Sequence, residues 1–247
     1  MSECKIISVV IPAYKEAENL SVLLPRLNSV LADIPGEHEV LIVDTQKPLD
    51  DTKSVCSENG ANHVARRGGN SYGDAIRTGF AQAGGKYTVV MDADGSHEPE
   101  VIRKMLCVMI KRKCDLVIGS RYCKGGYTDN NIVLRGMSLL LNSTYRILFN
   151  VKAKDVSNSF RMYRSEQIKK LNLKCDNFDI VEEILIELCF GNKDMDIREI
   201  PIRFNKRQAG DSKRELFTFI ISYLCTILRL MRMKLAAKNG FFGRGTV

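Results

Sequence analysis

The chain has 247 residues, 45% of them hydrophobic, and a formal net charge of +8, so it is long enough for one large buried core. Its eight cysteines show no CxxC spacing and it has three histidines, which argues against a disulfide framework or a zinc site and favours a reducing cytosol. The first residues lack a signal-peptide pattern, and no run of about 18 apolar residues predicts a membrane-spanning helix. The positive charge predicts an anionic partner, whereas nucleic acid is not expected because tryptophan and basic–aromatic clusters are missing.

Strands and helices are expected to alternate in the first half of the chain. Short apolar runs predict strands at 6–13, 40–44, 62–65, 86–94 and 115–121. Helical spacing predicts helices at 20–31, with Asn19 as a candidate cap, at 73–83 and at 99–109. This alternation predicts βαβ units and a mostly parallel sheet flanked by helices, in which ligands bind beyond the carboxyl ends of the strands.

The pattern changes after about residue 122. Residues 122–131 predict a loop and 132–149 a helix, followed by a short strand around 159–163 and another helix. A strand is expected at 197–204, and the residues from 216 onward are helical. We therefore expect one α/β domain over residues 1–215, followed by a C-terminal helix and tail over 216–247.

Two carboxylates, Asp92 and Asp94, follow the apolar run 89–91 with one small residue between them. Charged side chains are costly in a core, so paired acids at the end of a strand usually face a cleft, a cation or both. The alternative interpretation is a solvated Asp–Gly turn at residues 94–95.

Seven motifs occur in the order that is typical of glycosyltransferase family 2, and they most resemble its dolichol-phosphate or polyprenol-phosphate mannosyltransferases. The motifs are VVIPAYKEAENL, LIVD, MDADGSHEPE, GSRY, DVSNSFRMYR, REIPIRF and RQAGDSK. The resemblance covers residues 5–215 and implies a GT-A-like α/β fold. It also implies an inverting enzyme that moves a hexose from a GDP- or UDP-linked donor to a polyprenyl or dolichyl phosphate.

The resemblance makes the acidic pair part of a ligand set for Mg²⁺ or Mn²⁺. Departure of a nucleoside diphosphate builds up negative charge, which a hard cation held by oxygen ligands offsets. The implied metal ligands are Asp92, Asp94 and Ser96, and Ser96 stands where relatives often have Gln. Asp94 also belongs to the implied catalytic set, together with Arg121 and Arg135.

The donor nucleotide is implied to bind along the strand ends and in two loops. The residues concerned are Pro12, Tyr14, Glu16, Asp44, Asp74, Asp92, Arg207 and Lys213. Asp44 is followed by Thr45 where relatives have a second Asp, so guanine and uracil both stay open as the donor base. Asp74 contacts the base or ribose in one interpretation and only stabilises a helix N-terminus in the other. Arg207 and Lys213 either close on the diphosphate or form a plain basic loop.

The acceptor is implied to bind near Arg121 and Arg135. A phosphate monoester is ionised at neutral pH, so its oxygen needs no general base, but it needs cations that let it approach a second anion. The implied acceptor residues are Arg135, Ser138, Asn142 and Ser159, although Leu139 replaces an Arg of relatives. One of Glu182 and Glu183 corresponds to a family Glu near the site, and the other is expected on the helix surface.

The C-terminal helix is expected to be amphipathic. From 216 to 228 only Thr218, Ser222 and Thr226 are polar, and the cations Arg229, Arg232 and Lys234 follow. Such a helix lies in the membrane interface with its cations at anionic head groups, here at the cytoplasmic face. The alternatives are a core helix packed on the sheet and a helix packed on a membrane-protein partner.

Two other functions stay open at this point. Transfer to a sugar hydroxyl needs a carboxylate base near the acceptor, whereas the implied phosphate-directed arginines favour a phosphate acceptor. A catalytically silent subunit that binds nucleotide-sugar and is recruited by membrane partners agrees with the departures at Thr45 and Leu139. The intact pair Asp92 and Asp94, together with Arg121, favours an enzyme.

Overall fold

The computed structural model describes residues 5–129, 132–205 and 216–238, the last range without the side chains of 216–220 and 236–238. The strands are β1 (Ile7–Pro12), β2 (His38–Asp44), β3 (Asn62–Ala65), β4 (Tyr87–Val90), β5 (Leu116–Ser120), β6 (Tyr127–Thr128), β7 (Arg161–Arg164), β8 (Ile197–Pro201) and β9 (Arg203–Phe204). The helices are α1 (Ala17–Ala32), α2 (Thr52–Glu58), α3 (Tyr72–Gln82), α4 (Val101–Arg112), α5 (Ile132–Phe149), α6 (Ser165–Ile168), α7 (Ile180–Gly191) and α8 (Leu216–Lys238).

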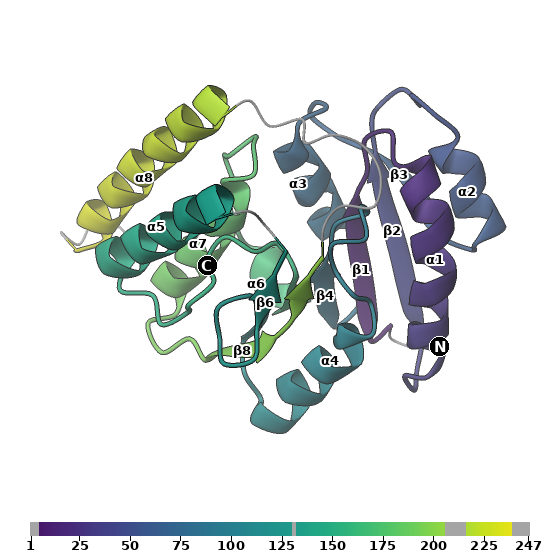
Figure 1. Ribbon diagram of the computed structural model, residues 1–247, viewed down its shortest axis with the longest axis horizontal. Helices are drawn as coiled ribbons and strands as arrows, with labels where there is room; N and C mark the ends of the chain where they lie inside the picture. The colour runs from purple at the N-terminus through teal and green to yellow at the C-terminus, as the bar shows by residue number, and fades with distance from the viewer. Residues whose placement is uncertain (1–4, 130–131, 206–215, 239–247) are drawn as a thin grey trace, which may run out of the picture.

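The central sheet has seven strands in the order β3-β2-β1-β4-β7-β5-β8. Every neighbouring pair in it is parallel except the two pairs that β7 makes. The mostly parallel α/β fold expected from the sequence is therefore confirmed. Helices cover both faces of the sheet, and α5 and α8 lie together at the end remote from α1 and α2 (Figure 1).

Alternate residues of the buried strands face two different layers of helices. Val9 and Ile11 of β1 pack in the core that α1 and α4 cover, whereas Val10 packs in the core that α3 and α7 cover. Gly79 of α3 permits the close approach of helix and sheet, because a Cβ there would collide with Val10. Both faces of the sheet are thus buried, as parallel strands linked by helices require.

Three local expectations are wrong. β4 ends at Val90 rather than near residue 94, so the acidic pair lies in the turn after the strand. Asn19 lies inside α1, whose N-cap is Glu16, and Asn19 Nδ2 donates to Glu16 Oε2 over 2.6 Å. Part of the expected loop 122–131 forms β6, which pairs with β9. A strand of two residues has no periodicity of its own, and its pairing depends on a partner distant in the sequence.

A buried polar layer joins α7 to α8. Glu182 and Glu183 are both fully buried, so the expectation that one of them lies on the surface is wrong. Glu183 accepts hydrogen bonds from two backbone N–H groups before α7 and pairs with Arg229 at 2.5 Å. The Tyr223 hydroxyl donates a hydrogen bond to Glu182 Oε1 over 3.2 Å. Arg229, one of the three cations expected at lipid head groups, is therefore engaged within the protein.

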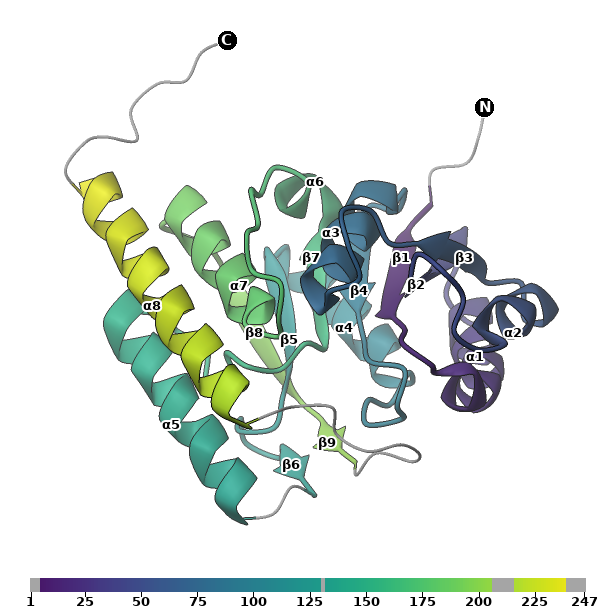
Figure 2. The same cartoon turned by 90° about the horizontal axis from the view of Figure 1, so that it is seen from above.

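Two hydroxyl-bearing residues of helix α8, Ser222 and Thr226, contact the rest of the protein. Thr226 is buried and donates to Asp179 over 2.5 Å, and Asn177 donates to Ser222 over 3.2 Å. Leu230 of α8 is buried, whereas other apolar side chains of α8, among them Leu224 and Leu228, are exposed, and α8 runs alongside α5 (Figure 2). Within the described ranges, every helix is too short or too polar to cross a bilayer.

We expect Glu182 to make the fold less stable as pH rises. Burial raises the pKa of Glu182 from 4.5 to about 8, although the nearby Arg161 favours the charged form. The protonated acid is thus favoured in the folded chain, and stability is lost as pH rises from about 4.5 to about 8. Urea denaturation across this window should show a smaller loss in Glu182→Gln than in the unmodified chain. Equal pH dependence of the two proteins would show that Glu182 is ionised when folded.

Candidate functional site

Four strand ends and one reversed strand form a polar rim at one edge of the sheet. β1, β2, β4 and β5 all run in the same direction, so their carboxyl ends meet at this edge. β7 runs against them and pairs Arg161 with both Val90 and Ile118. The segment 155–160, which precedes β7, therefore lies at the same rim, between the turn after β4 and the loop after β5.

The acidic turn, residues 92–96, is tied to its surroundings by hydrogen bonds. Ser159 Oγ donates to Asp92 Oδ2 over 3.1 Å, and the Ser96 N–H donates to Asp94 Oδ1 over 3.0 Å. Ser96 is 1% exposed, and its Oγ has no hydrogen-bond partner among the described residues. Two carboxylates and one orphaned hydroxyl suit a hard cation that takes its other ligands from a bound diphosphate. In the described part of the chain no three His, Cys, Asp or Glu side chains converge on one metal position, so the donor would have to complete the ligand set.

Arg121 is locked against Asp155. Its Nε and Nη2 donate to the two oxygens of Asp155 over 2.8 and 2.7 Å, and Nη2 also donates to Ser157 Oγ over 2.8 Å. Both members of the pair are buried. Burial disfavours the charge, but the Asp155 carboxylate outweighs this effect and raises the pKa of Arg121. The rim therefore holds a fixed guanidinium that stays charged.

Helix α5 carries three predicted acceptor residues, Arg135, Ser138 and Asn142, at helical spacing on one face. Ser138 Oγ lies 3.4 Å from Arg121 Nη2, and Arg135 is exposed one turn earlier. Asn142 is buried, and its Oδ1 accepts the backbone N–H of Val156 over 3.0 Å. Arg135 and Ser138 thus lie within reach of a ligand, whereas Asn142 fixes the segment 155–160.

The residues predicted for the nucleoside differ in burial. Tyr14 is 40% exposed after β1, and Glu16 follows it as the N-cap of α1. Asp44 is fully buried, the Thr45 N–H donates to its Oδ1 over 2.7 Å, and His63 Nε2 lies 3.1 Å from its Oδ2. Asp44 is therefore engaged with protein groups and shielded from solvent. The contact with the base stays a prediction.

Asp74 closes the glycine-bearing loop, residues 67–71, onto α3. Its Oδ2 accepts the Ser71 N–H over 3.0 Å, and Ser71 Oγ accepts the Asp74 N–H over 3.0 Å, which forms a capping box. Arg77 pairs with the same carboxylate at 2.8 Å. A Cβ on Gly69 would come close to this carboxylate. These contacts agree with an acid that stabilises the helix N-terminus, and they leave contact with the nucleotide a prediction.

Sequence reasoning missed two buried residues of the rim. Arg66 donates to the carbonyl oxygens of Ala13 and of residues 70–71, which ties the loop after β1 to the glycine-bearing loop. His97 accepts the Asp92 N–H at Nδ1 over 3.1 Å. His97 lies inside the motif MDADGSHEPE and Arg66 directly precedes the glycine-bearing loop, but a position in the sequence gives no sign of which backbone groups a side chain reaches.

Three predicted donor residues remain, and the structure describes only one of them, Pro12. Pro12 is the buried last residue of β1 and directs the chain toward the loop that holds Tyr14. Arg207 and Lys213, predicted for the diphosphate, lie outside the described residues. Their contact with the donor therefore stays a prediction.

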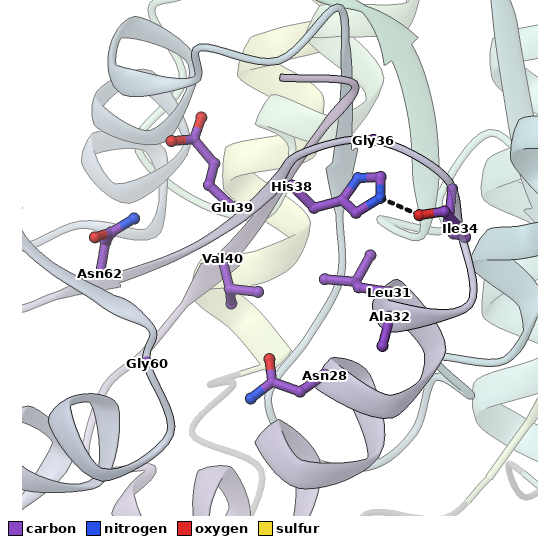
Figure 3. A pocket seen from close by; sticks show the side chains of 10 residues that line it. All are labelled: Asn28, Leu31, Ala32, Ile34, Gly36, His38, Glu39, Val40, Gly60 and Asn62. Carbon is purple, nitrogen blue, oxygen red and sulfur yellow. Dashed lines mark hydrogen bonds between the residues drawn. The ribbon is translucent and has the colours of Figure 1, made fainter. Parts of the chain in front are cut away.

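A cavity of about 310 Å³ lies at the opposite edge of the sheet. It is lined by the end of α1 and the first residues of β2 and β3, among them Leu31, His38 and Asn62 (Figure 3). Ligands of parallel sheets bind beyond the carboxyl ends of the strands, and this cavity lies at the amino ends. None of the predicted site residues lines it, so we place the candidate site at the polar rim.

The family model for glycosyl transferase family 2 matches residues 8–171. The chain belongs to this family. The matched residues run from β1 through β7 and α6, so they include the acidic turn, Arg121 and the segment 155–160. The family resemblance inferred from the motifs is therefore confirmed.

Two curated relatives align with most of this glycosyl transferase family 2 chain. The dolichol-phosphate mannosyltransferase of Pyrococcus furiosus is 32% identical over 234 residues, which cover 92% of this chain and 64% of that protein. The undecaprenyl-phosphate mannosyltransferase of Micrococcus luteus is 32% identical over 219 residues, which cover 83% of this chain and 85% of that protein. The chain thus spans less than two thirds of the Pyrococcus protein and most of the Micrococcus protein.

Solved structures of glucosyl-3-phosphoglycerate synthase from Mycobacterium tuberculosis share the fold. The complex with Mn²⁺, UDP and glucosyl-3-phosphoglycerate has a TM-score of 0.70 and 17% identity, and the match covers 92% of this chain and 80% of that chain. The complex of the same enzyme with Mg²⁺ and UDP also has a TM-score of 0.70. At this level of identity the likeness shows the GT-A fold alone.

Loss of the Asp155 carboxylate should destabilise the fold strongly. Asp155→Asn leaves the guanidinium of Arg121 buried beside a neutral partner, which should lower the free energy of unfolding by about 3 kcal/mol. The matched control is Asp33→Asn, because Asp33 pairs with Arg103 on the surface and its loss should cost less than about 1 kcal/mol. Urea denaturation at neutral pH measures both losses. Equal losses would contradict a structural role for the buried pair.

Proposed function

We propose that this chain is an inverting glycosyltransferase that moves a hexose, mannose or a glucose-like sugar, from a GDP- or UDP-linked donor to a polyprenyl or dolichyl phosphate. Membership of glycosyl transferase family 2 supports sugar transfer. The relatives named as dolichol-phosphate and undecaprenyl-phosphate mannosyltransferases support this class of acceptor. The geometry of the rim supports it independently.

One observation carries the proposal: the segment 155–159 touches both halves of the site. Asp155 and Ser157 hold Arg121 at one end of the segment, and Ser159 donates to Asp92 at the other. A carboxylate turn that suits a cation and a donor diphosphate is thereby joined to a fixed guanidinium. This arrangement favours a reaction in which two phosphate-bearing substrates meet.

In the proposed reaction an oxygen of the acceptor phosphate attacks the anomeric carbon of the donor sugar. The new bond joins that oxygen to the anomeric carbon, the bond from the anomeric carbon to the donor diphosphate breaks, and its electron pair leaves with the nucleoside diphosphate. The acceptor oxygen is already ionised at neutral pH, so no proton has to be removed. Attack opposite the leaving group inverts the anomeric centre.

Different groups of the rim would stabilise the negative charges of the donor diphosphate and of the acceptor phosphate. Mg²⁺ or Mn²⁺, when bound by Asp92, Asp94 and Ser96, would offset the charge on the leaving diphosphate. Arg135 would bind the acceptor phosphate, and Arg121 would offset charge on the donor side where the two anions meet. The residues proposed for the nucleoside and the diphosphate are Pro12, Tyr14, Glu16, Asp44, Asp74, Arg207 and Lys213.

A sugar hydroxyl is a less well supported acceptor, because it needs a carboxylate base. Asp155 is fully buried, and both of its oxygens accept hydrogen bonds from Arg121. Glu199 accepts the backbone N–H groups of residues 154 and 155. These two acids near Arg121 are therefore engaged in holding the rim, which favours an acceptor that needs no base.

Helices α5 and α8 support a peripheral position at a membrane surface. They lie side by side in both views (Figures 1 and 2). Both helices expose large apolar side chains, which we call together the α5–α8 apolar face: Ile132, Val133, Leu140, Ile147, Ile221, Leu224 and Leu228. A polyprenyl chain cannot leave the bilayer cheaply, since each buried CH₂ is worth about 0.8 kcal/mol. The enzyme would therefore have to bring its rim to the head groups.

The cytoplasmic side of the membrane is the proposed location. The seven described cysteines are unpaired, which agrees with a reducing compartment. The net charge of +8 would favour an anionic leaflet. A membrane-protein partner that covers the α5–α8 apolar face is the alternative to direct contact with lipid.

Transfer from a donor panel to a short polyprenyl phosphate tests the proposal. With Mn²⁺ present, Asp94→Ala should lower the rate by at least about 100-fold, because an ion that neutralises the diphosphate loses a ligand. Asp51→Ala is the control, since Asp51 is an exposed acid that makes no side-chain cap of α2, and it should leave the rate unchanged. Full activity in the presence of a chelator, or in Asp94→Ala, would remove the metal assignment.

Binding to anionic liposomes should depend on the α5–α8 apolar face. Changing Leu224 and Leu228, which are 56% and 58% exposed, to Gln should lower co-sedimentation several-fold and leave binding of soluble donor intact. Ile110→Gln on α4, at a side chain that is 53% exposed, is the matched control and should have no effect. Added salt should weaken binding by screening the positive charge. If the unmodified chain does not bind anionic liposomes at low salt, another protein must cover this face.

A further inference from the structure

His97 is a buried residue that touches the acidic turn without belonging to the proposed ligand set. Its side chain is 1% exposed. Its Nδ1 accepts the backbone N–H of Asp92 over 3.1 Å, and its Nε2 lies 3.2 Å from Asn158 Oδ1. The imidazole ring therefore lies between the acidic turn and the segment that precedes β7.

The neighbours of His97 determine which ring nitrogen carries the proton. A backbone N–H is only a donor, so Nδ1, which faces Asp92, must be unprotonated. Asn158 Nδ2 donates to Gly119 O over 2.6 Å, which leaves its Oδ1 to accept from His97. Nε2 then carries the proton and the ring is neutral. A continuous path of hydrogen bonds thus runs from β5 through Asn158 and His97 to the acidic turn.

Two aromatic rings hold the imidazole in place. Phe160 stacks on His97 with ring centroids 4.8 Å apart and an interplanar angle of 17°, and Phe204 meets His97 edge-on at 5.4 Å. Phe204 also lies beneath Arg121, whose guanidinium carbon is 5.4 Å from the ring centroid. His97 and Arg121 therefore both pack against the ring of Phe204.

We infer that His97 is a positioning residue that sets the orientation of Asp92 for the donor-bound cation; this inference rests on the proposed metal site. His97 holds the backbone of Asp92 and Ser159 holds its carboxylate, so Asp92 is fixed at both ends. Holding the Asp92 backbone requires the hydrogen-bond acceptor Nδ1 of the ring, whereas the size of the ring is not required. Residues that orient metal ligands change metal affinity by about 10- to 100-fold when they are lost.

Two substitutions that both introduce an amide distinguish the role of Nδ1 from the role of Nε2. His97→Asn places an amide near the former Nδ1 and keeps an acceptor for Asp92, whereas His97→Gln places it near the former Nε2 and keeps only the contact with Asn158. Calorimetry with saturating GDP or UDP measures the apparent Kd of Mn²⁺. We expect this Kd to rise at least about 10-fold in His97→Gln and by less than about 3-fold in His97→Asn. The KM for polyprenyl phosphate should stay unchanged in both variants.

Thermal denaturation of His97→Asn and His97→Gln shows whether each variant is folded. Because both variants lose the imidazole ring, they should lose similar stability. Asn158→Ala leaves the ring in place but removes the acceptor for Nε2–H, and it should also raise the Kd of Mn²⁺. Equal Mn²⁺ affinities in His97→Asn and His97→Gln, or unchanged affinity in all three variants, would overturn the positioning role. If the unmodified chain binds neither nucleotide in a manganese-dependent way, the proposed metal site itself fails, which distinguishes that failure from a failure of the His97 assignment.

Discussion

The buried ion pair between Arg121 and Asp155 is the interaction on which the rim depends. Asp155 is fully buried and both of its oxygens accept from Arg121, so the loop after β5 and the segment 155–160 cannot separate without leaving a buried charge unpaired. Glu199 of β8 supports the pair by accepting the Asp155 N–H over 3.0 Å. Rigid placement matters for a reaction between two anions, because the cationic groups must be in place before the phosphates meet.

The reversed direction of β7 is the second constraint. A segment that precedes a parallel strand lies at the amino edge of the sheet, away from ligands. Because β7 is antiparallel to β4 and β5, the segment 155–160 lies at the ligand-binding rim instead. Arg161, at the start of β7, is fully buried and donates to the carbonyl oxygens of Val181 and Val156. The same strand therefore connects the rim to the helical layer of α7 and α8.

Local patterns in the sequence predicted most of the elements and the edge of the sheet at which polar groups gather. The predicted helix 132–149 has the bounds of α5, and the apolar runs correspond to β1, β2, β4 and β5. Pairing was harder, because the two residues of β6 and the antiparallel register of β7 depend on partners distant in the sequence. Burial of both Glu182 and Glu183 was also missed, because contacts that cover them come from α8. The same limit applies to His97, which lies inside the motif MDADGSHEPE but contacts Asn158, a partner distant in the sequence.

The central claim is that an ionised phosphate is the nucleophile. The most direct measurement compares a short polyprenyl phosphate with the corresponding polyprenol as acceptors, using α-linked GDP- and UDP-sugars and Mn²⁺. We expect a polyprenyl phosphate sugar whose anomeric centre is inverted relative to the donor, and no transfer to the polyprenol. Comparable transfer to the polyprenol, or a product that retains the donor configuration, would contradict the claim.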